Sequence, residues 1–165
     1  MRIVVSNLLP DPVNLEVAGL PESGPGKRFV FSKNLVLDRI DASTPRDGSP
    51  QNPSRRHAGT YSGLVTVLRV AEPNDVFLQP GSYLFNYEVI YRFTDLANTP
   101  LRKGQITAHG VFYLSGVDFQ PVEPPNRLAI TGGTEAYATA RGQITQQQNK
   151  PKAPPEQETW QLDIT

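Results

Sequence analysis

The chain has 165 residues, 16 acidic and 16 basic side chains, and a formal net charge of zero. This length fits one core of ordinary size, and the balanced charge gives no reason to expect nucleic acid or an anionic membrane as a partner. Because there are no cysteines and only two histidines, disulfides, thiolate metal sites and a histidine-rich metal site are excluded. We therefore expect neither a metal nor another cofactor.

Turn-forming residues are frequent: the chain has 13 glycines and 16 prolines, and no long segment has a helical period. This composition predicts many short strands. No segment approaches membrane-spanning length, and the first apolar run, interrupted by Asn7 and Pro10, is too short for a signal peptide. The simplest expectation is a cytoplasmic, bacterial protein.

The chain begins with a segment that we expect to form an N-terminal arm, residues 1–27, with short candidate strands at 3–5 and 13–17. The remaining residues, 28–165, form the predicted domain. The polar, proline-containing stretch at 41–58 is expected to be a mobile loop able to cover a cavity mouth.

Residues 29–41 form the first clear strand. Val36, Asp38 and Ile40 share one face, and Leu35, Leu37 and Arg39 share the other, so periodicity alone does not select the inner face. Asp38 is therefore either a pocket carboxylate or a surface aspartate near a strand end.

Residues 59–70 form the next strand, whose inner face is expected to carry Tyr61, Gly63, Val65, Val67 and Arg69. For Arg69 the alternative is a side chain that extends to water, as arginines at strand ends commonly do.

Residues 81–95 have the clearest alternation, with an aromatic face of Tyr83, Phe85, Tyr87, Val89, Tyr91 and Phe93. An antiparallel strand with one dry side directs that face inward. The rings either fill a core or line a pocket. The three tyrosines favour a pocket, because each buried hydroxyl needs a partner.

Residues 103–114 continue the pattern, with Ile106, Ala108, Gly110, Phe112 and Leu114 inward. The small residues Ala108 and Gly110 are expected to leave room beside the rings of the preceding strand. His109 lies on the polar face, which indicates an exposed position or a subunit contact and not a catalyst.

Residues 128–145, LAITGGTEAYATARGQIT, contain a short strand, a Gly132-Gly133 corner through positive φ, an excursion with Tyr137, and a second strand that begins at Arg141. By itself this pattern is also typical of a structural corner with a solvated arginine. A polar linker is expected over 146–158, and a last strand over 159–165 with Trp160, Leu162 and Ile164 on one face.

The run LAITGGTEAYATARGQI resembles the signature of the allene oxide cyclase and dirigent protein superfamily. Residues 128–133 are similar to the cyclase version of the signature. The dirigent version resembles the run in which Gly-Gly-Thr is followed by an aromatic residue and then by Ala-Arg-Gly. TWQLDI, at 159–164, resembles the last strand of dirigent proteins. The resemblance implies a single all-β domain, an eight-stranded antiparallel barrel with an apolar cavity, and a homo-oligomer (dimer or trimer).

The resemblance is incomplete at the positions that matter in the cyclases. Asp38 stands where those proteins carry a glutamate, so a carboxylate is retained at this position. Ile40, Val65 and Phe112 stand where they carry an asparagine, a cysteine and a tyrosine. True allene oxide cyclase activity is therefore not expected.

The members of this superfamily hold an unsaturated substrate in one folded shape while a ring closes. We therefore expect an isomerase or cyclase of secondary metabolism that acts on an unsaturated hydrophobic small molecule. The alternative is a non-catalytic, dirigent-like or carrier barrel, and a purely structural subunit is less favoured. The predicted catalytic residues are Asp38, Tyr87, Tyr91 and Arg141. The predicted substrate-binding residues are Tyr61, Val65, Val67, Arg69, Phe85, Val89, Phe93, Ala108, Gly110 and Phe112.

Overall fold

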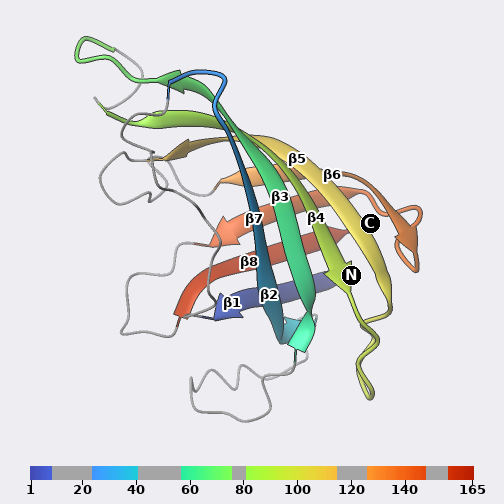
Figure 1. The fold of residues 1–165 in the computed structure, drawn as a ribbon. Coiled ribbons are helices and arrows are strands. Elements are labelled where there is room, and N and C mark those ends of the chain that lie inside the picture. Colours follow the sequence, from blue (N-terminus) through green and yellow to red (C-terminus); the bar gives the residue numbers. More distant parts are fainter. Residues whose placement is uncertain (9–23, 41–56, 76–80, 115–125, 148–155) are drawn as a thin grey trace.

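The computed structural model is a closed barrel of eight antiparallel strands, in which each strand pairs with its neighbours along the chain (Figure 1). It describes residues 1–8, 24–40, 57–75, 81–114, 126–147 and 156–165. The strands are β1 (Arg2–Leu8), β2 (Arg28–Ile40), β3 (His57–Val70), β4 (Tyr83–Phe93), β5 (Gly104–Leu114), β6 (Arg127–Glu135), β7 (Gly142–Gln147) and β8 (Glu156–Ile164). The predicted all-β, eight-stranded barrel is confirmed.

The barrel closes through β1, which pairs with β2 on one side and with β8 on the other. The N-terminal ammonium group donates to the Ile164 carbonyl oxygen at 2.6 Å, and Arg2 Nε lies 2.5 Å from Asp163 Oδ1. The first part of the expected N-terminal arm is thus a barrel strand, which gives the edges of β2 and β8 a hydrogen-bonding partner. The strand expected at 13–17 and residues 41–56 of the covering loop expected at 41–58 lie outside the described residues, whereas His57 and Ala58 belong to β3.

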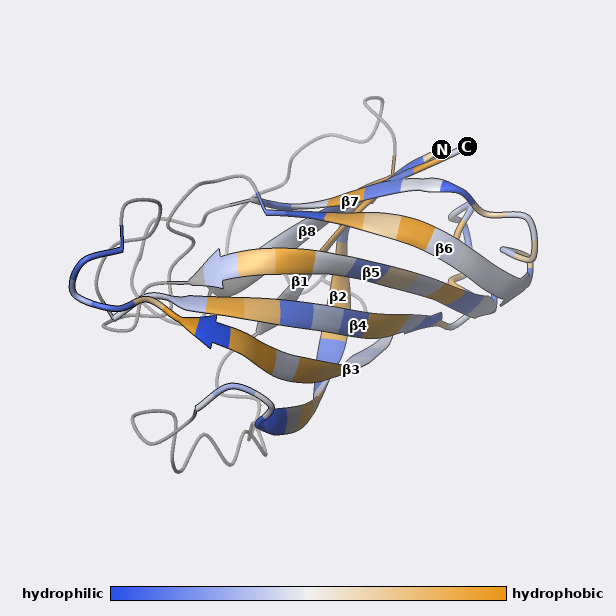
Figure 2. Cartoon of the chain, turned by 90° about the horizontal axis from the view of Figure 1, so that it is seen from above, coloured by the Kyte–Doolittle hydropathy of each residue, from blue (hydrophilic) through white to orange (hydrophobic). Residues whose placement is uncertain are grey.

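The alternation predicted for β4 and β5 is confirmed. Tyr83, Phe85, Val89, Tyr91 and Phe93 are buried in the core together with Ile106, Ala108 and Phe112. The opposite face is mixed: it carries Leu84, Ile90 and Val111 beside polar residues, and exposed His109 holds its Nε2 2.6 Å from Asn86 Oδ1. Figure 2 shows the resulting succession of apolar and polar bands along these strands.

Two β-bulges decide which side chains face inward where the sequence pattern was ambiguous. On β2, Leu37 pairs with Val5 and Arg39 with Val4, so Asp38 is the extra residue of the bulge. An extra residue resets the alternation. Leu35, Leu37 and Ile40 therefore pack with the core, and the expected grouping of Ile40 with Asp38 is wrong.

The second bulge lies on β3, where Val67 pairs with Phe85 but the next paired residue is Arg69, opposite Leu84. Val67 is buried in the core, whereas the side chain of Arg69 is 52% exposed and forms an ion pair with Asp75. The expected inward position of Arg69 is thus wrong, because the bulge turns it to the outer face.

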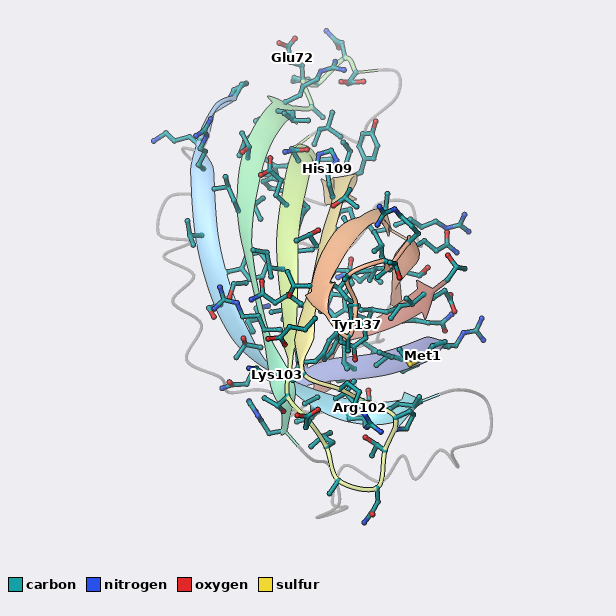
Figure 3. All side chains as sticks on the ribbon, turned by 90° about the vertical axis from the view of Figure 1, so that its right-hand side faces the viewer. Met1, Glu72, Arg102, Lys103, His109 and Tyr137 are labelled. Carbon is teal, nitrogen blue, oxygen red and sulfur yellow. The ribbon has the colours of Figure 1, made fainter. Side chains whose placement is uncertain are left out.

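The barrel has two ends with different structures. The terminal end carries Met1, Thr165, the β4–β5 hairpin and the turn after β6, and the far end carries Leu8 and the start of β2. In Figure 3, Tyr137, Arg102 and Met1 gather towards the terminal end and Glu72 lies at the far end. Buried Tyr137 packs against Phe93 (5.5 Å between ring centroids) and closes the terminal end.

The Gly132-Gly133 corner expected within the signature is not a corner. β6 runs through both glycines to Glu135, and neither glycine has a positive φ; the chain turns later, at Glu135 (φ 52°). Gly133 is needed for a close approach instead, because a Cβ there would lie 2.3 Å from the Tyr137 carbonyl oxygen. The glycine thereby lets the turn fold back onto the strand.

Candidate small-molecule site

Three rings from three strands form an aromatic stack inside the barrel, which we define as Tyr87, Phe112 and Trp160. The Tyr87 and Phe112 centroids are 4.5 Å apart at an interplanar angle of 29°, and those of Phe112 and Trp160 are 6.1 Å apart at 17°. Offset stacking at such distances is favourable for aromatic pairs. β4, β5 and β8 thus build one continuous aromatic surface.

The aromatic stack runs from a half-buried ring to a fully buried one. Tyr87 is only partly covered, whereas Trp160 is 2% exposed and lies 6.0 Å from Tyr61 and 6.4 Å from Tyr91. Tyr61 and Tyr91 stack on each other at 5.5 Å and are both buried. Tyr87 is therefore more exposed than Tyr61 and Tyr91.

Polar groups that the sequence analysis did not single out also lie on the inner face. Lys33 is paired with inward-facing Tyr61, and its Nζ lies 5.8 Å from the Tyr61 ring centroid, within cation–π range. Gln146 is paired with Trp160, and its Oε1 accepts a hydrogen bond from Asn126 Nδ2 at 3.0 Å. Both amides are buried.

The Trp160 indole nitrogen is the most unusual of these groups. It is buried, and it has no hydrogen-bond partner within the part of the chain that the structure describes. Most buried donors in proteins are satisfied, so each exception requires an explanation.

The structure places Asp38 away from the aromatic stack. Ser6 Oγ donates to Asp38 Oδ2 and lies 3.0 Å from Thr159 Oγ1. Ser6 follows inward-facing Val5 on β1, so the strand pleat directs Ser6 to the outer face, and the hydrogen bond holds Asp38 there. The carboxylate and Tyr87 are thus not brought together.

Arg141 is also distant from the aromatic stack. It is exposed at the terminal end, where its Nη1 donates to the Ala140 carbonyl at 2.7 Å and its backbone pairs with Thr165. Its guanidinium is therefore held by the neighbouring backbone at the terminal end of the barrel, where Tyr137 is buried.

The expected lining residues are on the inner face, with Arg69 as the exception. Tyr61, Val65, Val67, Phe85, Val89, Phe93, Ala108 and Phe112 are all buried there. The room expected beside Gly110 is occupied, however. A Cβ at that position would lie 2.8 Å from Leu128 Cδ2, and one at Gly63 would lie 2.7 Å from the Phe31 ring. These glycines serve close packing and do not open space.

Simple signals would have identified some of the missed residues. Extending the alternation back from Leu35 places Lys33 on the inner face, but the sequence analysis began its face assignment at Leu35. The linker predicted over 146–158 is wrong at both ends, because β7 runs to Gln147 and β8 begins at Glu156. Gln146 lies two residues after inward-facing Ile144, so the strand alternation places it inward as well. Trp160 was placed on the correct face and treated only as packing.

Other features of the described residues do not compete with this site. They contain no cluster of histidine, aspartate and glutamate side chains suited to a metal ion, and no helix that would cross a membrane. A surface hollow of about 760 Å³ lies at the β4–β5 hairpin, between Asp95 and Arg102. Arg102 Nη1 already donates there to the Thr99 and Leu101 carbonyls, at 2.6 and 3.0 Å.

The closed antiparallel barrel is the fold of the allene oxide cyclase-like and dirigent proteins, as the resemblance at residues 128–145 predicted. No family model and no curated protein matches the sequence. Among solved structures, a pyocyanin demethylase superimposes with a TM-score of 0.56 and 22% identity, over 100% of this chain and 98% of the other. The pterocarpan synthase dirigent protein GePTS1 superimposes with a TM-score of 0.54 and 13% identity, over 99% of this chain and 83% of the other.

Proposed function

We propose that the barrel binds a flat, unsaturated, mostly apolar small molecule against the aromatic stack and directs its stereoselective cyclisation in secondary metabolism. The observation that carries the proposal is the geometry of the stack, which begins at half-buried Tyr87 and continues into the barrel through Phe112. Flat unsaturated ligands gain contact with such rings at little conformational cost. The names of both structural neighbours, one for pyocyanin and one for pterocarpan, concern small molecules that contain aromatic rings.

Two physical effects would accelerate a ring closure here. Holding the substrate in one folded conformer removes entropy from the barrier, which in ideal cases is worth about 7–11 kcal/mol. A phenol can also donate a hydrogen bond to an oxygen that gains charge in the transition state. Tyr87 is the residue that we assign to that role, and the buried wall supplies the shielding from water.

A non-catalytic carrier is the second candidate, and the scatter of the polar residues favours it. Asp38 lies on the outer face, Arg141 at the terminal end, and Tyr91 is fully buried behind other rings. Catalysis would therefore depend on Tyr87 and on groups such as Lys33, whereas binding needs only the aromatic wall.

The experiment compares Tyr87→Phe with Tyr113→Phe, since Tyr113 is paired with Leu84 on the outer face and provides a matched loss of one hydroxyl. Native mass spectrometry of the purified protein first identifies a co-purified ligand or product, which supplies the substrate. For a catalyst we expect Tyr87→Phe to lower turnover about 10²-fold while affinity changes by less than about tenfold. A carrier would lose affinity only.

Identical behaviour of the two variants, with affinity and turnover both at the parent level, would show that Tyr87 does not contact the ligand and would refute the proposal. The homo-oligomer and the cytoplasmic location remain predictions. Sedimentation analysis of the purified chain checks the former.

A further inference from the structure

The proposed site leaves open which chemical features the ligand must carry. This question rests on the proposed function, because it concerns the same stack of Tyr87, Phe112 and Trp160. The inner end of the stack indicates these features, since the Trp160 indole N–H there has no hydrogen-bond acceptor among the described residues.

The surroundings of Trp160 restrict where a partner can lie. Phe112 lies almost parallel to the indole ring (17°), whereas Tyr61 and Tyr91 approach at 58° and 72°. The N–H bond lies in the plane of the indole ring, so it does not point at the face of the nearly parallel Phe112 ring. Across the strand pair, the neighbour of Trp160 on the inner face is Gln146.

An indole N–H donates one hydrogen bond and accepts none. Within the described residues the Trp160 N–H has no acceptor, although the side chain is only 2% exposed. Leaving such a donor buried and unpaired is destabilising, and replacement by phenylalanine would avoid the cost while keeping an aromatic ring. The polar atom is therefore better explained by a partner that arrives from outside the chain.

We infer that Trp160 is the polar anchor of the site and donates its indole N–H to a ring nitrogen or carbonyl oxygen of a flat, unsaturated ligand. The ligand lies along the aromatic stack, with its acceptor edge at Trp160 and its far edge towards Tyr87. The buried amides of Gln146 and Asn126 provide further hydrogen-bonding capacity beside that edge. A hydrocarbon of the same outline binds more weakly, because it leaves the donor unpaired.

Trp160 is the single tryptophan of the chain, which makes the test specific to one atom. Protein labelled with ¹⁵N in the indole ring gives one side-chain N–H signal. Quinoline and naphthalene are the probes, since they have the same two-ring outline and differ by one acceptor nitrogen. We expect quinoline to move the indole proton downfield and to bind about two- to twelvefold more tightly than naphthalene, the range of one net neutral hydrogen bond.

A second measurement removes the donor without changing the ring shape. Biosynthetic replacement of tryptophan by benzothienylalanine exchanges the N–H for a sulfur atom at position 160 alone. The preference for quinoline should then disappear, while naphthalene affinity stays at the parent value.

The outcomes separate this inference from the proposed function. If both probes bind the parent protein equally and shift the signal alike, the donor role of Trp160 is overturned and binding at the stack stands. If neither probe disturbs the signal, both are overturned. Should the sulfur analogue fail to fold, the signal in the unmodified protein still decides between these results.

Discussion

Gly133→Ala should destabilise the protein strongly although neither a turn nor a positive φ requires glycine there. A Cβ at Gly133 would lie 2.3 Å from the Tyr137 carbonyl oxygen and 2.5 Å from that of Gln105, about 1 Å closer than ordinary contact begins. Both atoms belong to the backbone, so β5 or the turn that carries Tyr137 must shift. Overpacking of this kind costs about 1–3 kcal/mol.

The adjacent glycine provides a matched control. A Cβ at Gly132 would meet only Thr107 Oγ1, at 3.5 Å, so Gly132→Ala should leave the packing intact. Since 1 kcal/mol corresponds to about 2–4 °C in a chain of 150–250 residues, we expect Gly133→Ala to lower Tm by about 2–12 °C. Gly132→Ala should stay within about 3 °C of the parent.

Thermal unfolding followed by far-ultraviolet circular dichroism measures both variants under the same conditions. The reasoning would be refuted if the two variants had the same Tm, because the difference rests on the close approach of the Tyr137 turn to Gly133. A larger loss at Gly132 would likewise contradict the register of β5 and β6.

Burial raises the pKa of Tyr137 above its usual 10.0 and outweighs the opposing effect of the hydrogen bond from the Arg102 amide. The contribution of the neutral Tyr137 phenol to protein stability is therefore fully present below pH 10 and is lost as the pH rises through the folded pKa. Absorbance at 295 nm should show a tyrosine ionisation step above pH 10, and Tyr137→Phe should reduce that step by one phenol. Burial alone would raise the pKa of Asp163, but the hydrogen bonds from the Arg2 and Gln161 side chains outweigh it and lower the pKa below 3.8. The stability due to Asp163 is therefore present above about pH 3.8 and lost as pH falls through the folded pKa, and Asp163→Asn should flatten the acid limb of a Tm-against-pH curve. Asp38→Ala should lower Tm, since Ser6 loses a buried acceptor worth about 1–3 kcal/mol, and should leave quinoline affinity unchanged; an affinity loss without a Tm change would return Asp38 to the site.

The alternation of β4 and β5 could be predicted from the sequence because a strand of a closed barrel has one dry and one wet face. Each aromatic at positions 83–93 then had to point inward, whatever its partners were. The resemblance at residues 128–145 added the strand number and the closure. A local pattern was sufficient there because one face of the strand is buried, so burial recurs at every second residue.

The positions of Asp38 and Arg69 could not be predicted, because each depends on a bulge that only strand pairing reveals. The pairing of β1 with β2 makes Asp38 the extra residue of a bulge, and that of β3 with β4 turns Arg69 outward. The roles of Gly110 and Gly133 were likewise hidden. Both glycines lie close to atoms that are distant in the sequence or belong to the following turn, and the residues next to each glycine do not indicate that contact.

The sequence by itself therefore determined the all-β class and the aromatic inner face, since these follow from composition and local periodicity, and the resemblance supplied the closed eight-stranded barrel. Only the tertiary structure decided which polar groups meet. It placed Lys33 beside Tyr61 and Gln146 beside Trp160, and it left the buried indole N–H without an acceptor in the described part of the chain. Hydrogen bonds join atoms from distant strands, and their partners are set by register and bulges, which no single strand encodes.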